Sequence, residues 1–147
     1  MSISLDKLYF YPGEAITGKI TIDSNKSKTL SKVSIHILPS QYWRVKDDQG
    51  FYACPFQHIG KTIDMSKIEC WDKYKNKDKD NEIYIIPFSI NIPKVYLPTF
   101  EYYFKNKSIH HRYECRTTFS SSYHSYERSV YIIIASPHDC TEKKPLV

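Results

Sequence analysis

The sequence predicts an all-β protein, built as an antiparallel two-sheet β-sandwich of the immunoglobulin-like kind. Apolar and polar residues alternate with a period of two along most of the chain, and almost no segment has the period of an amphipathic helix. Thirteen tyrosines and seven phenylalanines stand against two methionines, and aromatic side chains suit the pleated surface of a sheet. We therefore expect about seven or eight strands in hairpin-like succession.

The first three predicted strands cover residues 2–10, 15–23 and 32–43. The sequence Tyr-Pro-Gly-Glu at residues 11–14 marks the turn between the first two. In the second and third strands, alternate positions are branched aliphatic residues, which indicates one face in the core and one in solvent. The residues expected to face inward are Ile16, Ile20, Ile22, Val33, Ile35 and Ile37.

The alternation weakens over residues 44–81. One irregular stretch of this length is unusual in a compact domain, so we expect one or two edge strands or a functional loop there. A short strand is expected within residues 61–71. Residues 74–81 mix charges and lack apolar side chains, which predicts a mobile loop tip.

Regular strands return at residues 81–92 and continue at 99–104, 109–119 and 127–136. Pro93 and Pro98 interrupt the chain between the first two of these. Because proline lacks a backbone donor and fixes φ, we predict a shaped crossover between the sheets at this point. In the strand at 109–119, the expected inward set is Ile109, His111, Tyr113, Cys115, Thr117 and Phe119. Residues 1–137 are expected to form one domain, and 138–147 a disordered tail or linker stub.

Four motifs, taken in order, resemble the N-terminal domain of the arrestin family. They are PGEAITGKITI at residues 12–22, QYWRV at 41–45, IPFSINIPKVYLPTFE at 86–101 and IHHRYECRTTF at 109–119. Trp43 and the run Leu97–Phe100 are most similar to the alpha-arrestin branch. Glu101, Tyr102, Lys105 and Asn106 are loosely similar to the retromer cargo-subunit branch. The resemblance implies an arrestin-like sandwich over residues 3–136.

The resemblance also implies a function. It predicts a non-enzymatic adaptor or scaffold that binds receptor or transporter tails or trafficking machinery, in the cytoplasm or at the endosomal or plasma-membrane periphery. The chain departs from the family in three ways: it has room for one domain of the usual two, no Pro-Pro-x-Tyr motif, and no pair of lysines near Lys7. The alternative is a small-ligand or lipid-binding sandwich, with residues 44–81 as a lid. Peripheral membrane association and dimerisation through an exposed edge strand are further options.

Three residues are candidates for partner binding: Lys7, Arg112 and Arg116. Arg112 and Arg116 share one face of their predicted strand, with Glu114 between them. They are either a solvated face neutralised by Glu114 or a docking surface for an acidic or phosphorylated peptide, since guanidinium groups bind carboxylates and phosphates in pairs of hydrogen bonds. Lys7 lies near a strand that we expect at a sheet edge, where an extended peptide could pair.

The sequence predicts no catalytic residues, no metal and no cofactor. Cys54 and His58, with Cys70, come closest to a zinc site but lack the usual two close ligand pairs. Cys115 and His111 share a face but lie about 13 Å apart along a strand, too far for a nucleophile and its base.

No apolar run reaches the ~20 residues of a membrane span. The net charge of +5 suits acidic partners. Binding of single-stranded nucleic acid is disfavoured, because Tyr113 is expected to face inward and so cannot stack on a base.

Overall fold

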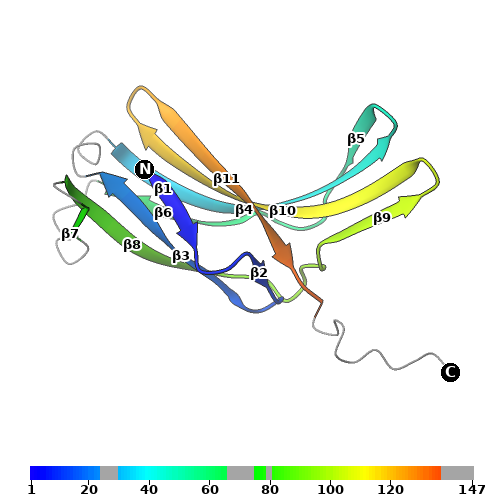
Figure 1. The fold of residues 1–147 in the computed structure, drawn as a ribbon, viewed down its shortest axis with the longest axis horizontal. Coiled ribbons are helices and arrows are strands. Elements are labelled where there is room, and N and C mark those ends of the chain that lie inside the picture. Colours follow the sequence, from blue (N-terminus) through cyan, green and yellow to red (C-terminus); the bar gives the residue numbers. More distant parts are fainter. Residues whose placement is uncertain (24–29, 66–74, 79–80, 137–147) are drawn as a thin grey trace.

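The computed structural model describes residues 1–23, 30–65, 75–78 and 81–136, and this part of the chain is built from strands (Figure 1). None of the described residues forms a helix that could cross a membrane. The strands are β1 (Ser2–Leu5), β2 (Tyr9–Phe10), β3 (Ala15–Asp23), β4 (Leu30–Val45), β5 (Asp48–Tyr52), β6 (Ile59–Asp64), β7 (Lys75–Asp78), β8 (Asn81–Asn91), β9 (Phe100–Phe104), β10 (Lys107–Ser121) and β11 (Ser125–Ile134).

The strands form two sheets, so the predicted β-sandwich is confirmed. The smaller sheet has the order β1-β3-β8-β7, and the larger has the order β2-β11-β10-β4-β5. Two further strands extend the larger sheet: β6 pairs with β4, and β9 pairs with β10. All neighbours are antiparallel except β2 and β11, which run parallel.

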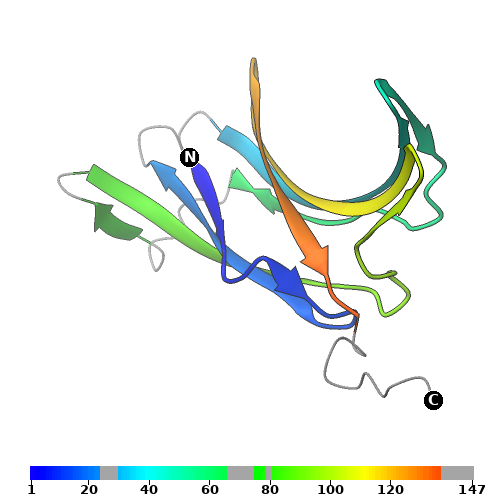
Figure 2. The same cartoon turned by 45° about the vertical axis from the view of Figure 1, so that its right-hand side comes forward.

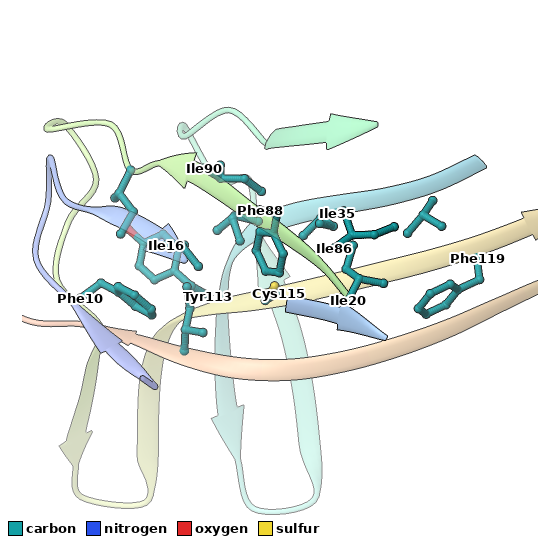
Figure 3. Packing of buried hydrophobic residues seen from close by; sticks show 14 of the residues in the cluster. Phe10, Ile16, Ile20, Ile35, Ile86, Phe88, Ile90, Tyr113, Cys115 and Phe119 are labelled. Atoms are coloured by element: carbon teal, nitrogen blue, oxygen red, sulfur yellow. The ribbon is translucent and has the colours of Figure 1, made fainter. Parts of the chain in front are cut away.

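The core lies between the two sheets and is made by alternate residues of each strand (Figure 3). Ile16 and Ile20 of the small sheet and Ile35 of the large sheet are fully buried, as are the other three aliphatic residues that were expected inside. Tyr113 and Cys115 of β10 are likewise buried. Each fully buried aliphatic or aromatic side chain stabilises the fold by roughly 1.5–3 kcal/mol, so this alternation largely determines which face of each strand is inside.

The long strands β4 and β10 pair with each other over their whole lengths, from Leu30–Ser121 to Val45–Lys107. Their outer neighbours change midway. β4 pairs with β6 over residues 32–37 and with β5 over 41–45, while β10 pairs with β11 over 113–120 and with β9 over 107–111. Pro39 lies in the gap between β6 and β5, where the missing backbone donor interrupts neither of these outer ladders.

Beyond Pro39, the large sheet continues as a four-stranded extension, which consists of residues 41–52 and 100–111. Figures 1 and 2 show that the extension bends away from the small sheet. The face of the large sheet that is turned away from the small sheet is therefore concave. Ile109 was expected to face the core, but it belongs to the extension and is 40% exposed because the small sheet does not reach it.

The N-terminal strand and residues 44–81 differ from the sequence-based expectation. Residues 2–10 form two short strands in different sheets rather than one. The described part of 44–81 contains three strands, β5, β6 and β7, and the predicted mobile loop is wrong for Lys75–Asp78, which pairs with β8. Ladder pairing satisfies backbone groups and does not require an apolar composition. Residues 66–74, 79–80 and the predicted tail 138–147 lie outside the described residues.

The predicted crossover between sheets is confirmed, because β8 belongs to the small sheet and β9 to the large one. Gly13 has a φ of 85°, a conformation that glycine adopts without steric cost. Gly18 allows a close approach between β3, β1 and the Phe88 ring. A Cβ at Gly18 would collide with the backbone oxygen of Ser4 and would lie 2.9 Å from the Phe88 ring.

We expect Gly18→Ala to lower the free energy of unfolding by about 1–3 kcal/mol, because the added methyl group has no space between β1 and the Phe88 ring. Urea denaturation followed by circular dichroism measures this. The control is Ser89→Ala on the exposed face of β8, which should change stability by less than about 0.5 kcal/mol. Equal stability of Gly18→Ala and the wild type would contradict the close packing described here.

Candidate functional site

The concave face of the large sheet contains a groove of about 610 Å³, which we call the concave groove. It lies over the part of β4 and β10 where their outer neighbours change. Its lining includes Arg44, Phe51, His58, Arg112, Arg116 and Tyr131. Two of the three residues predicted to bind a partner, Arg112 and Arg116, are thus brought together on one surface.

Arg112 is held by an acidic residue and by aromatic rings. Its Nη2 atom donates to Glu101 Oε1 at 2.7 Å, and its guanidinium lies 5.2 Å from the Tyr42 ring centre and 5.8 Å from that of Tyr131. The hydrogen bond from Arg112, followed by one from Tyr103, holds the pKa of Glu101 below its usual value. The side chains of both ion-pair partners stay partly exposed, at 35% and 40%, so the pair is accessible from the solvent.

Arg116 makes a similar pair further along β10. Its Nε and Nη2 atoms donate to the two oxygens of Glu114 at 3.1 and 3.2 Å, and Ser129 donates to Glu114 Oε1 at 2.5 Å. Burial raises the pKa of Glu114, but the hydrogen bonds from Ser129 and Arg116 outweigh it, and the pKa is lowered overall. The expected neutralisation by Glu114 holds for Arg116, whereas Arg112 pairs with Glu101 of β9, and docking of an acidic or phosphorylated peptide stays a prediction.

Arg44 is a third guanidinium in the concave groove, and sequence analysis did not select it. Its Nη2 atom donates to Gln49 Oε1 at 3.4 Å, and it meets no carboxylate in the described part of the chain. Three arginines thus line the concave groove, and the carboxylates near them in the described residues are those of Glu101, Glu114 and Glu127. Arg44 joins this surface because it pairs across the ladder with Ser108 of β10, a register that the sequence does not reveal.

Lys7, the third predicted residue, does not line the concave groove. It lies between β1 and β2, forms an ion pair with Glu14, and has its Nζ atom 5.3 Å from the Phe10 ring centre. Glu14 also accepts a hydrogen bond from the Tyr11 backbone at 2.8 Å, and its pKa is lowered, mainly by Lys7. These bonds brace the first turn. As predicted, β1 is an edge strand of the small sheet, and a role of Lys7 in partner binding stays a prediction.

A buried polar chain lies behind the groove, on the core side of β10. His111 is fully buried, and its Nε2 atom is 2.7 Å from the Tyr113 hydroxyl, which donates to the Leu97 carbonyl at 2.6 Å. His111 therefore donates from Nε2, and its Nδ1 atom has no hydrogen-bond partner among the described residues. Burial lowers the pKa of His111. On the opposite face of β10, His110 is also buried, because its ring stacks on that of Tyr42 with the ring centres 4.4 Å apart.

The cysteines and histidines of the described residues form no cluster suited to a metal ion. No group of three His, Cys, Asp or Glu residues there could hold a metal ion. Cys115 is fully buried, and burial raises the pKa of its thiol to about 11, so it is protonated at neutral pH. Cys54 is half-buried, and Cys70 lies outside the described residues.

We expect Cys115 to resist alkylation in the folded protein, because its thiol is both buried and protonated. Iodoacetamide treatment at pH 8, followed by peptide mass spectrometry, should modify Cys54 and leave Cys115 intact. Treatment in urea, where both thiols are accessible, should modify Cys115 and serves as the control. Labelling of Cys115 at the rate of Cys54 in the native protein would contradict its placement in the core.

We also expect His111 to make the free energy of unfolding smaller at acidic pH. Its pKa is lower in the folded chain than the ordinary 6.5, so below about pH 6.5 the unfolded chain binds a proton that the folded chain does not. The free energy of unfolding should therefore decrease as the pH falls through this range. Urea denaturation between pH 7.5 and 5.5 should show a smaller decrease in His111→Gln. An unchanged slope in His111→Gln, in a variant that keeps the wild-type circular dichroism spectrum, would refute the assignment.

Comparison with known proteins agrees with this architecture. A family model described as the C-terminal domain of arrestin (or S-antigen) matches residues 1–138, whereas the sequence motifs resembled the N-terminal domain of the same family. Among solved structures, the sporulation control protein Spo0M from Bacillus subtilis is similar, with a TM-score of 0.54 and 14% sequence identity. The match covers 92% of this chain but 48% of Spo0M, so the chain spans about half the length of that protein. No curated protein sequence matches the chain. The family match extends over nearly the whole chain and the fold agrees with it, so the chain belongs to the arrestin family.

Proposed function

We propose that the chain is a non-enzymatic adaptor that binds an acidic or phosphorylated segment of a protein partner in the concave groove. The observation that carries this proposal is Arg44, a guanidinium in the groove that meets no carboxylate in the described residues. Guanidinium groups bind carboxylates and phosphates with two parallel hydrogen bonds, and Arg44 has this capacity free. Arrestin-family proteins act broadly in trafficking and scaffolding, which favours a protein as the ligand.

Arg112 and Arg116 can contribute although each already has a partner. Their ion pairs are partly exposed, and an exposed ion pair contributes only about 0–1 kcal/mol, so an incoming carboxylate or phosphate can compete with Glu101 or Glu114. A ligand that reached Arg44 and Arg112 would also pass Phe51, which is 72% exposed at the same groove. An acidic segment that also contains an apolar side chain therefore fits this surface best.

The test uses synthetic peptides of one length, either neutral, acidic or phosphorylated, with binding measured by fluorescence anisotropy. We expect the acidic and phosphorylated peptides to bind and the neutral one not to bind, with affinity falling as salt is added. Arg44→Glu, and separately the double variant Arg112→Glu with Arg116→Glu, should weaken binding about 10-fold or more, because hydrogen bonds to charged groups contribute about 1.5–3 kcal/mol each.

The matched control is Lys19→Glu, which makes the same change of charge on β3 in the small sheet, away from the groove. It should bind as the wild type does. In cells, proximity labelling with the wild-type chain and with the Arg44→Glu chain then identifies partners that depend on the groove. Equal binding of all three peptides, or full binding by the arginine variants with an intact fold, would refute the proposal.

A further inference from the structure

Strand β9, with the sequence Phe-Glu-Tyr-Tyr-Phe, is an open edge of the large sheet. It pairs with β10 on one side, and the described residues provide no strand on its other side. All five of its residues are exposed, and four are aromatic. The strand contains no proline and no lysine, the two residues that commonly protect sheet edges from further pairing. An edge of this kind is a template for an additional strand.

The other edges are less suited to pairing. β5, on the far side of the extension, contains Gly50, a residue that weakens strands. β1 is only four residues long, and alternate residues of it, Ile3 and Leu5, are half-buried against the core. β9 is thus the edge with the longest run of exposed aromatic residues in the described chain.

We propose that β9 pairs with β9 of a second copy of this chain, antiparallel, about a two-fold axis that passes through Tyr102. In this register Phe100 lies opposite Phe104 of the second copy, and Glu101 lies opposite Tyr103. Such an interface is closed, because the same surface is used on both copies. The two large sheets would then form one continuous sheet.

The backbone of β9 supports this register. A two-residue turn, Lys105 and Asn106, joins β9 to β10, so Phe104 and Lys107 close the turn with a backbone hydrogen bond. Because antiparallel ladders alternate, the backbone groups of Phe100, Tyr102 and Phe104 point toward β10, and those of Glu101 and Tyr103 point to the open edge. An axis at Tyr102 places these free groups of Glu101 directly opposite those of Tyr103 in the other copy.

Neighbouring registers are worse. An axis at Glu101 would place two carboxylates directly opposite each other, which is destabilising. An axis at Tyr103 would require Lys105 to pair as a strand residue, but its φ is 54° and it belongs to the turn. An axis midway between residues would place free backbone groups opposite groups that are already used by β10. The Tyr102 register is therefore the one that pairs all five residues.

Side chains of the two copies also meet on both faces in this arrangement. On the concave side, Glu101 lies diagonally across from both Lys105 and Glu101 of the second copy, so each carboxylate has one opposite and one like charge as a diagonal neighbour. On the convex side, Tyr102 and Phe104 line an apolar groove of about 540 Å³ together with Trp43, Val45, Tyr52 and Ile109. The pairing joins this groove to the same groove of the second copy through Tyr102. Because a five-residue strand pair is small, we expect dimerisation at concentrations on the order of micromolar.

The variant Tyr103→Pro should prevent dimerisation and leave the fold of the single chain intact. Its backbone N–H points to the open edge, so proline removes a bond to the second copy and none to β10. Analytical ultracentrifugation should show a concentration-dependent dimer of the wild type and a monomer of Tyr103→Pro with an unchanged circular dichroism spectrum. The proposal would be overturned if the wild type stayed monomeric up to about 100 μM. It would also be overturned if the Tyr103→Pro chain dimerised as well as the wild type.

A second measurement tests the register. In a chain whose Cys54, Cys70 and Cys140 are replaced by Ser, Tyr102→Cys places two thiols across the axis at a non-hydrogen-bonded pair, with Cα atoms about 4.5 Å apart. Mild oxidation should convert most of this chain to a disulfide-linked dimer. In the matched control, Tyr103→Cys, the two Cα atoms would be about 8 Å apart, and no cross-link should form. Equal cross-linking of both variants would refute the Tyr102 axis. Neither variant changes an arginine of the concave groove, so this outcome is independent of peptide binding.

Discussion

The ladder between β4 and β10 is the interaction on which the rest of the structure depends. Both strands run on past the small sheet, so one half of the ladder is covered by the core and the other half continues as the extension. The covered half provides the stability, through residues such as Ile35, Tyr113 and Cys115. The uncovered half carries many of the exposed aromatic residues and Arg44, while Arg112 and Arg116 follow on β10 beyond it, on the face turned away from the small sheet. The proposed binding surface therefore lies on strands whose position is fixed by a core that they share.

Much of the fold could be predicted from the sequence, because a period of two determines which face of a strand is inside whatever its neighbours are. The aliphatic sets of β3 and β4 and the crossover with Pro93 and Pro98 are examples. Failures occur where a neighbouring strand decides the outcome. Lys75–Asp78 has no apolar pattern and is ordered by pairing with β8. Ile109 has the right pattern, but the small sheet ends before it, so it stays exposed.

The same distinction applies to the candidate site. Arg112 and Arg116 could be placed on one face from their spacing alone. Arg44 could not be added to them, because it lies more than sixty residues earlier and joins them only through the register between β4 and β10. The burial of His110 likewise depends on a cross-strand neighbour, Tyr42. Lys7 illustrates the opposite case, since its main contact, Glu14, is near in sequence and gives it a structural role.

The separation of β4 from β10 in the sequence has a consequence for how the protein is made. Leu30 pairs with Ser121 and Val45 with Lys107, so β4 leaves the ribosome long before its principal partner. Until then, β4 can pair with β5 and β6 on one edge only, and its other edge stays open beside the apolar side chains of Val33, Ile35 and Ile37. Closing so long a loop is slow, and an open apolar strand is prone to aggregate while it waits. The interval between the synthesis of β4 and that of β10 is therefore the stage at which the nascent chain is most exposed to aggregation.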